Sequence, residues 1–140
     1  MPFSRPPRIG VIAIVAILAT TAIIAALVTR KDFLRAINDE RVNKGCHALV
    51  SASDSLIDSA RQHSREMSDA DQIFHSTLYI GKWSEVGEIV GRGDDLDSLF
   101  DAFMESPEHR KIMLDCAYDI AAIGIFRDDG IWLTGRFYSK

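Results

Sequence analysis

The chain contains 140 residues, carries a formal net charge of −4 and is 47% hydrophobic. Without the apolar leader described below, about 110 residues remain, which is enough for one domain with a substantial buried core. A mildly acidic chain in which no basic patch stands out is not typical of a nucleic-acid-binding protein. We therefore expect no nucleic-acid partner.

A long apolar run follows a short N-terminal flank, residues 1–8, that carries Arg5 and Arg8. Residues 9–29 contain no charged side chain, and about 20 apolar residues are enough to cross a bilayer. A cleaved signal peptide usually has a shorter apolar core and a small-residue exit motif. We therefore expect an uncleaved transmembrane signal-anchor over residues 9–29 that tethers an extracytoplasmic domain, residues 32–140, to the cell membrane. Secretion after cleavage is the alternative.

Two cysteines, Cys46 and Cys116, lie far apart and form no Cys-x-x-Cys pair, so a zinc ribbon or a redox motif is not supported. In an exported protein the simple interpretation is one disulfide, which in the loop-entropy picture stabilises the fold by roughly 4 kcal/mol. Two unrelated buried thiols are the alternative. A disulfide also favours an extracytoplasmic position for the domain.

Two helices are predicted in the first half of the domain. The segment 32–43 has a partial apolar face and stops before Gly45. On this helix Asn38 and Arg41 share one face, where we expect surface positions with solvated or locally hydrogen-bonded side chains. The segment 51–68 is more strongly amphipathic and places His63 on its buried stripe, where a lone histidine is more often a hydrogen-bonded core residue than a ligand.

The segment 69–90 is predicted to be irregular, with short extended pieces at 73–74 and 86–90. The Gly-x-Gly at 91–93 predicts a loop and is too weak a signal for phosphate binding.

Residues 96–114 predict two helices that meet at a corner. Asp94 or Asp95 is a suitable N-cap for the first helix. Ser106 and Pro107 end that helix and begin the next, because proline disfavours helical geometry before it and suits the first helical position. His109 therefore lies in the first turn of the second helix, beside the corner. Its side chain can point into a groove, or it can have only a structural role in capping or packing at the corner.

Two buried strands are predicted near the C-terminus, at 118–126 and 131–138. The turn between them, 127–130, contains Gly130, which supplies the positive φ of a tight hairpin.

The order of these motifs is more informative than any one of them. They are an Asn-x-x-Arg helix at 38–41, Ala60-x-x-His63-Ser64-x-x-Met67, Phe74-His75-Ser76, Gly87-Glu88, Phe103-Met104-x-Ser106-Pro107-x-His109-Arg110, Ile123-Gly124-Ile125 and a final Trp/Phe strand. This order resembles the CAP superfamily, also called SCP domains, which includes cysteine-rich secretory proteins, antigen 5 and pathogenesis-related proteins. The Ser-Pro-x-His-Arg corner resembles the compact bacterial branch, and the resemblance covers about residues 32–138.

The resemblance implies an α+β fold: an α-β-α sandwich with a small antiparallel sheet between helical layers, here preceded by an N-terminal transmembrane helix. It also implies a cleft where two histidines and one or two glutamates converge, matched by His75, Glu88 and His109. The fourth family residue is not matched cleanly, because Glu105 lies one position early and Ser106 takes its place.

A divalent-metal site is the first hypothesis for this cleft. His75 and His109 would be ligands for Zn²⁺ or another divalent cation, with Glu88 as a third ligand or an orienting partner. A hydrogen-bonded polar cluster is the alternative.

A binding module is the second hypothesis, because the family is associated with lipids and cell-surface partners. An apolar groove would be flanked by Phe74, Trp83, Phe103 and Met104, and the alternative is that these four residues are plain core.

A metal-dependent or Ser/His hydrolase of the peptidase type is the third hypothesis. Ser64, Ser76 and Ser106 are the available nucleophiles. The sequence has no nucleophile-elbow motif and no His-Glu-x-x-His. We therefore favour a membrane-anchored binding module without catalysis.

Overall fold

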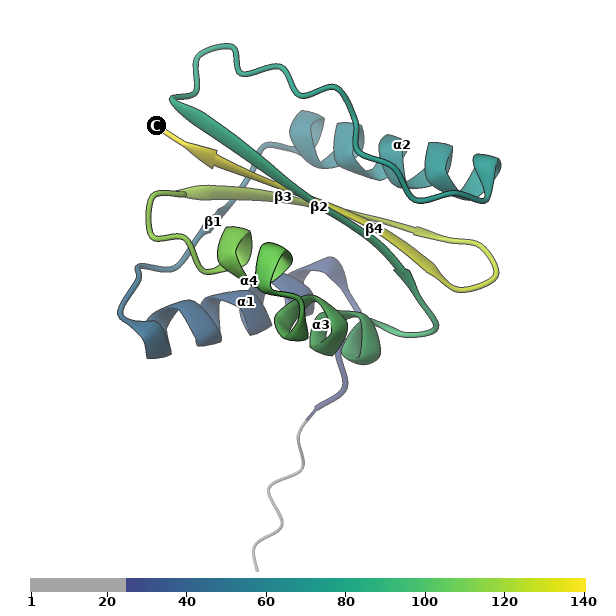
Figure 1. Cartoon of the computed structure of the whole chain (residues 1–140), viewed down its shortest axis with the longest axis horizontal. Coiled ribbons are helices and arrows are strands. Elements are labelled where there is room, and N and C mark those ends of the chain that lie inside the picture. Colours follow the sequence, from purple (N-terminus) through teal and green to yellow (C-terminus); the bar gives the residue numbers. More distant parts are fainter. Residues whose placement is uncertain (1–24) are drawn as a thin grey trace, which may run out of the picture.

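The computed structural model describes residues 25–140. Over these residues the elements follow in the order α1 (Arg30–Lys44), β1 (Val50–Ser51), α2 (Asp54–Ala70), β2 (Glu85–Gly93), α3 (Leu96–Glu105), α4 (Pro107–Met113), β3 (Ile120–Arg127) and β4 (Ile131–Ser139). The sheet lies between two helical layers, with α2 on one face and α1, α3 and α4 on the other (Figure 1). This is the layered α+β architecture that the resemblance implies.

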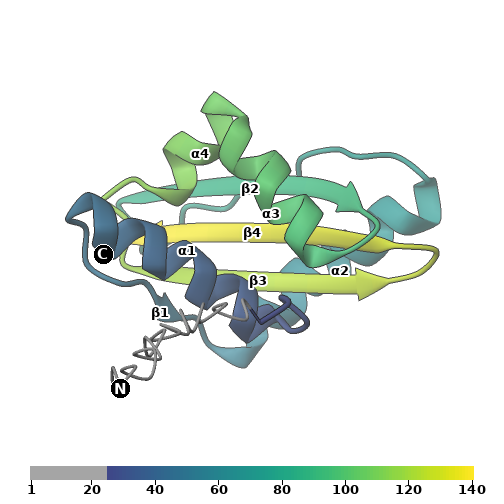
Figure 2. The ribbon, with the colours of Figure 1, turned by 90° about the horizontal axis from the view of Figure 1, so that it is seen from below.

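The sheet has the strand order β1-β3-β4-β2 (Figure 2). The pairs β3–β4 and β4–β2 are antiparallel, whereas β1 pairs with β3 in parallel. The expectation of an antiparallel sheet is therefore wrong at β1. This strand has only two residues, both exposed, so it leaves no alternating pattern in the sequence.

The expectation of a loop at 91–93 is also wrong, because these residues continue β2. Gly93 pairs with Ile131, and Gly91 pairs with Leu133. A Cβ atom at Gly91 would lie 2.7 Å from the Phe103 ring, so this glycine allows α3 to pack closely on the strand. The expected extended piece at 73–74 is absent from the described secondary structure.

The helix ends follow local capping chemistry. Thr29 and Asp32 form a capping box at the start of α1, and Gly45 ends it with φ 97°. Asp95 caps α3 by accepting a hydrogen bond from the Ser98 N–H at 2.8 Å. The predicted helices are thus confirmed, with ends that shift by a few residues.

The larger part of the core lies between the sheet and the layer of α1, α3 and α4, and Phe33, Ile37 and Phe137 are fully buried there. The amphipathic face of α2 covers the opposite side of the sheet. His63 on this face is 3% exposed and hydrogen bonds to the Phe74 carbonyl at 2.7 Å, as predicted for a core histidine.

The expectation of a surface position for Arg41 is wrong, because its side chain is fully buried. Its guanidinium donates to the carbonyls of His47, Met113, Asp115 and Tyr118 at 2.7–3.1 Å. Asn38 also has a structural partner, since it bonds both to the N–H and to the carbonyl of Leu49. The two polar side chains that suggested a solvated face therefore fasten α1 to the loops around it.

The disulfide between Cys46 and Cys116 is present, with 5.1 Å between the Cα atoms. It joins the loop after α1 to the loop between α4 and β3. Arg41 binds the carbonyl of Asp115 in that second loop, so a covalent and a hydrogen-bonded link hold the same two segments together.

None of the helices within residues 25–140 is long and apolar enough to span a membrane. The predicted anchor, residues 9–29, lies mainly outside the described residues, and its last five residues, 25–29, are not helical.

Replacement of Arg41 by methionine tests how much this buried guanidinium contributes. We expect the free energy of unfolding to fall by about 3 kcal/mol, because several carbonyls would lose their donor away from water. Urea denaturation followed by tryptophan fluorescence measures the loss.

The exposed Arg35 is the matched control, because it makes only an i,i+3 ion pair with Asp32 at the surface. Arg35→Met should change stability by less than about 1 kcal/mol. Equal losses for the two variants would contradict a special role for Arg41.

Candidate functional site

Glu88 is the best-buried carboxylate of the predicted site, with 1% of its side chain exposed. It lies in β2. Its Oε1 accepts from the backbone N–H of Ser76 and from Nδ1 of His75, each at 2.9 Å. Its Oε2 accepts from the Ser76 hydroxyl and from Nε of Arg136, the latter at 3.0 Å. Both oxygens of Glu88 are therefore already used by protein donors.

These hydrogen bonds decide the charge of Glu88. Burial alone raises the pKa of a carboxylate, because it disfavours the charged form. The hydrogen bonds from Ser76, Arg136 and His75 outweigh burial and lower the pKa of Glu88 below its ordinary value of 4.5. The site is thus built around an ionised carboxylate.

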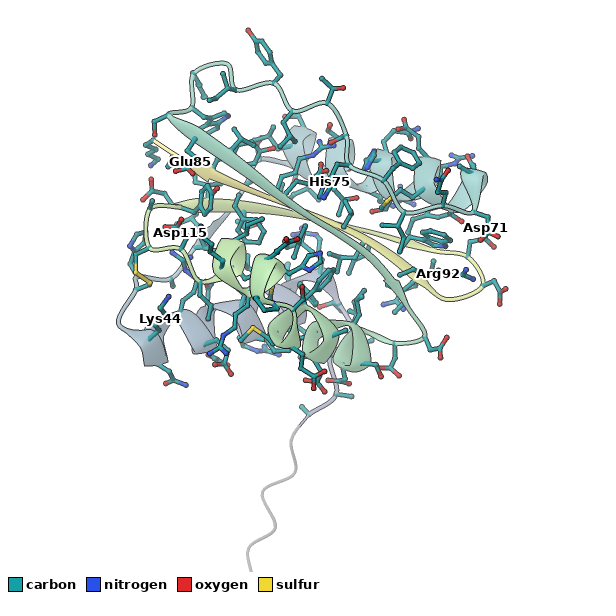
Figure 3. The ribbon with its side chains drawn as sticks, viewed as in Figure 1. Lys44, Asp71, His75, Glu85, Arg92 and Asp115 are labelled. Carbon is teal, nitrogen blue, oxygen red and sulfur yellow. A yellow bond between two sulfur atoms is a disulfide. The ribbon has the colours of Figure 1, made fainter. Side chains whose placement is uncertain are left out.

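His75 lies on the segment between α2 and β2, beside the strand that carries Glu88 (Figure 3). Its side chain is 63% exposed. Because the Glu88 carboxylate can only accept, Nδ1 of His75 carries a proton in this bond, and in the neutral ring the lone pair lies on Nε2. His75 therefore offers solvent a ligating nitrogen whose orientation is set by a buried carboxylate.

His109 lies in the first turn of α4, as predicted, and is half-buried. Its Nδ1 and the Ser106 hydroxyl are 2.7 Å apart, and its ring packs against Phe103 at 5.0 Å between centroids. Burial and the neighbouring charge of His75 both lower the pKa of His109. The electrostatic effect of His75 on His109 and the His75–Glu88 hydrogen bond place these three side chains in one neighbourhood.

Glu105 is placed differently. It is exposed at the end of α3 and lines a separate hollow of about 440 Å³ with basic residues that include Lys44 and Arg110. No hydrogen bond or ion pair of the described residues joins Glu105 to either cleft histidine.

The side chains that could bind a metal ion are few in this region. Within residues 25–140 no group of three or more His, Cys, Asp and Glu side chains is arranged to hold a metal ion. Both oxygens of Glu88 already accept hydrogen bonds from four protein donors. Glu88 is therefore suited to orient His75 and not to bind a metal ion itself. The protein ligands that remain are Nε2 of His75 and, when Nδ1 donates to Ser106, Nε2 of His109.

The four apolar side chains suggested for a lipid groove do not line one groove. Phe103 is 3% exposed in the core, while Met104 lines the hollow beside Glu105. Trp83 packs against Tyr138 on the other side of the sheet, and Phe74 contacts His63 edge-on.

The three candidate nucleophiles differ in what they contact. Ser64 is fully buried and donates to the Gly124 carbonyl at 3.0 Å. Ser76 is bound to Glu88 and to Arg136. Of the three, Ser106 is the serine that contacts a histidine ring.

Arg136 is a further residue of the site that no motif in the sequence indicated. It lies on β4 and links three parts of the site, because it donates to Glu88, to the hydroxyl of Ser76 at 3.0 Å and to the hydroxyl of Ser59 on α2 at 2.9 Å. The available signal was the charge itself, since an arginine within an otherwise apolar strand needs a partner when that strand is buried.

Known proteins share this arrangement of elements. Residues 34–137 match the sequence profile of the CAP family, described as the cysteine-rich secretory protein family. The chain therefore belongs to the CAP family, as the order of its motifs suggested. No curated protein sequence matches it.

Solved structures of similar fold come from bacteria and from a parasitic worm. An outer surface protein of Borrelia burgdorferi is 17% identical with a TM-score of 0.71, and the match covers 83% of this chain and 98% of that one. An extracellular protein with an SCP domain from Bacillus anthracis is 18% identical with a TM-score of 0.64, over 83% of this chain and 45% of that one. Venom allergen-like protein 4 of Schistosoma mansoni is 10% identical with a TM-score of 0.56, over 77% and 84% of the two chains.

Replacement of Glu88 by glutamine tests the buried carboxylate. Because the folded protein lowers the pKa of Glu88, its charge stabilises the fold above the ordinary value of 4.5, and this contribution disappears as the pH falls through the lower pKa of the folded state. We expect Glu88→Gln to cost about 3 kcal/mol at pH 7, since Arg136 would lose its charged partner. Urea denaturation between pH 7 and pH 3 should show a shallower acid-induced loss for the variant.

Asp101→Asn is the matched control, because Asp101 is an exposed helical carboxylate with no hydrogen-bonded partner among the described residues. It should leave both the stability and its pH dependence unchanged. A Glu88→Gln variant as stable as the native chain at pH 7 would contradict this account.

Proposed function

We propose that this CAP domain is an exported, membrane-anchored binding module that takes up a divalent cation, with Zn²⁺ as the best chemical match, between His75 and His109. The observation that supports the proposal most directly is the His75–Glu88 hydrogen bond. A carboxylate that binds one imidazole nitrogen fixes the ring and leaves the other nitrogen for a metal, as in many zinc sites.

The charge state of His109 supports the same role. A metal needs a neutral imidazole, and the pKa of His109 is lowered by burial and by His75. Two protein ligands are fewer than the three of most catalytic zinc sites, so water would complete the coordination and binding would be weak. In this role the cation would join the loop before β2 to α4.

A hydrolytic role has one observation in its favour, the contact between the Ser106 hydroxyl and the His109 ring. This contact uses Nδ1 and is the local bond of an N-cap residue to a side chain three positions later, which explains it without catalysis. Binding is therefore the better-supported function.

Isothermal titration of the chain with ZnCl₂ at pH 7 tests cation binding. We expect one binding event that weakens at least tenfold in both His75→Gln and His109→Gln, because each would remove one of the two nitrogens. Binding should also weaken between pH 7 and pH 5, since protonation of the imidazoles removes their lone pairs.

His47→Gln is the matched control, because His47 is exposed and pairs with Asp119 in another part of the domain. This variant should bind like the native chain. Equal binding by all three variants, or no heat of binding in the native chain, would contradict the proposal.

The location of the protein has its own test. The disulfide between Cys46 and Cys116 supports an oxidising compartment, and the apolar segment 9–29 supports a single anchor. In cells that express the full chain, we expect carbonate washing to leave it in the membrane fraction and external protease to degrade the domain. Release of the chain into the medium would instead support cleavage after the leader.

A further inference from the structure

The edge of β3 beyond β1 has backbone groups without a hydrogen-bond partner among residues 25–140, and it is only partly open, because Ile123 is 2% exposed and Ile125 is half-buried. β1 pairs with only the first two residues of β3 and then ends, with the Ala52 N–H donating to the Ala121 carbonyl at 2.8 Å. The polar groups of successive residues point to alternate sides of a strand, so the next groups on this side are those of Ile123 and Ile125. No hydrogen bond within residues 25–140 is found for these outward N–H and C=O groups.

A hollow of about 710 Å³ lies along this edge, and we call it the β3 groove. Its floor is β3 from residue 123 to 127, and its walls are residues 28–30 at the start of α1 and residues 54–61 on α2. α2 can come this close because Gly124 has no side chain, and a Cβ there would lie 2.1 Å from the backbone nitrogen of Arg61. Figure 2 shows β3 at the border of the sheet, with β1 beside only part of it.

The walls restrict what can pair with this edge. Paired strands lie about 4.8 Å apart. In a second copy of the chain the same edge of β3 would itself lie between α1 and α2, so the helices of the two copies would collide before the strands could pair. A single extended peptide has no such walls and fits between the two helices.

The charges of the β3 groove differ between its ends. Asp54 and Asp58 lie toward the beginning of β3, because α2 starts directly after the segment that pairs with it. Arg127 and Arg30 lie at the other end, where the guanidinium of Arg127 donates to the carbonyl of Val28 at 2.5 Å. A strand parallel to β3 would thus have its amino end near carboxylates and its carboxyl end near guanidinium groups.

We propose that the β3 groove binds an extended peptide of another protein, which adds to the sheet as a strand parallel to β3 and places a carboxylate-rich carboxyl end beside Arg30 and Arg127. The outward groups of Ile123 and Ile125 supply the main-chain hydrogen bonds, as in other cases of strand addition to a sheet edge. The groove contains neither His75, Glu88 nor His109, so this interaction is independent of cation binding.

The experiment uses the full chain in detergent micelles and a labelled synthetic peptide of about seven residues, the length of a typical strand. The peptide alternates valine and threonine, with one lysine at its amino end and two aspartates at its carboxyl end. We expect saturable binding by fluorescence anisotropy, and slower amide hydrogen exchange at Ile123 and Ile125 when the peptide is bound. Two control peptides should each bind at least tenfold more weakly: one with the charged ends exchanged, and one N-methylated at alternate residues.

Variants of the chain separate pairing at the edge from general damage. Ile125→Pro removes one outward N–H that β4 does not use, and Asp58→Trp fills the groove from an exposed position on α2. Each should weaken binding at least tenfold while circular dichroism shows a folded chain. Ile125→Val keeps the N–H, and His75→Gln changes only the cation site, so both should bind like the native chain.

Several results would overturn the proposal. Equal binding of the N-methylated peptide would show that the main chain is not used. Protection of the Ile123 and Ile125 amides before any peptide is added would show that a segment of this chain, or a second copy, already covers the edge. Absence of binding by the native chain, while the zinc titration succeeds, would reject the β3 groove and leave the proposed cation site standing.

Discussion

The ionised carboxylate of Glu88 is the centre on which the predicted site depends. Its oxygens accept hydrogen bonds from Ser76 and His75 on the loop before β2 and from Arg136 on β4. Arg136 in turn reaches Ser59 on α2. One buried charge thus joins a strand, a loop, a second strand and, through the guanidinium, a helix. A buried carboxylate would be costly without these donors, so the segments that supply them must stay in place.

On the other side of the sheet, the buried charge of Arg41 also joins separate segments. Its partners are backbone carbonyl groups, whereas the partners of Glu88 are hydrogen-bond donors. Burial lowers the pKa of Arg41, while the charges of Asp115 and Asp119 oppose this shift. Its four carbonyl partners include the end of α4, where helical carbonyls lack partners within the helix. Together with the disulfide, Arg41 fixes α4 against α1. Since α4 carries His109, this arrangement also helps to set the position of the second imidazole.

The two proposed surfaces lie at opposite edges of the sheet. The histidines gather beside β2, and the β3 groove lies along β3, with β4 between the two strands. Each surface has polar groups without a protein partner among the described residues. At β2 this group is an imidazole nitrogen, and at β3 it is the outward N–H and C=O groups. The hollow of about 710 Å³ along β3 is lined by neither His75, Glu88 nor His109, so the two proposed surfaces do not overlap at these residues. A cation at the histidines and a peptide in the β3 groove, as proposed above, would therefore not compete.

The sequence by itself determined the elements whose signals are local. Helical periodicity, the Ser106-Pro107 corner and the turn before β4 placed the helices and the final hairpin. The order of motifs also identified the family and indicated His75, Glu88 and His109 as site residues. Tertiary structure decided the rest, because partners far apart in the chain are not visible in local patterns. The burial of Arg41, the role of Arg136 as a partner for Glu88, the parallel pairing of β1 and the continuation of β2 through Gly93 all arise from contacts between distant segments. A polar side chain shows in a sequence only that it needs a partner, whereas the fold decides whether that partner is water or protein.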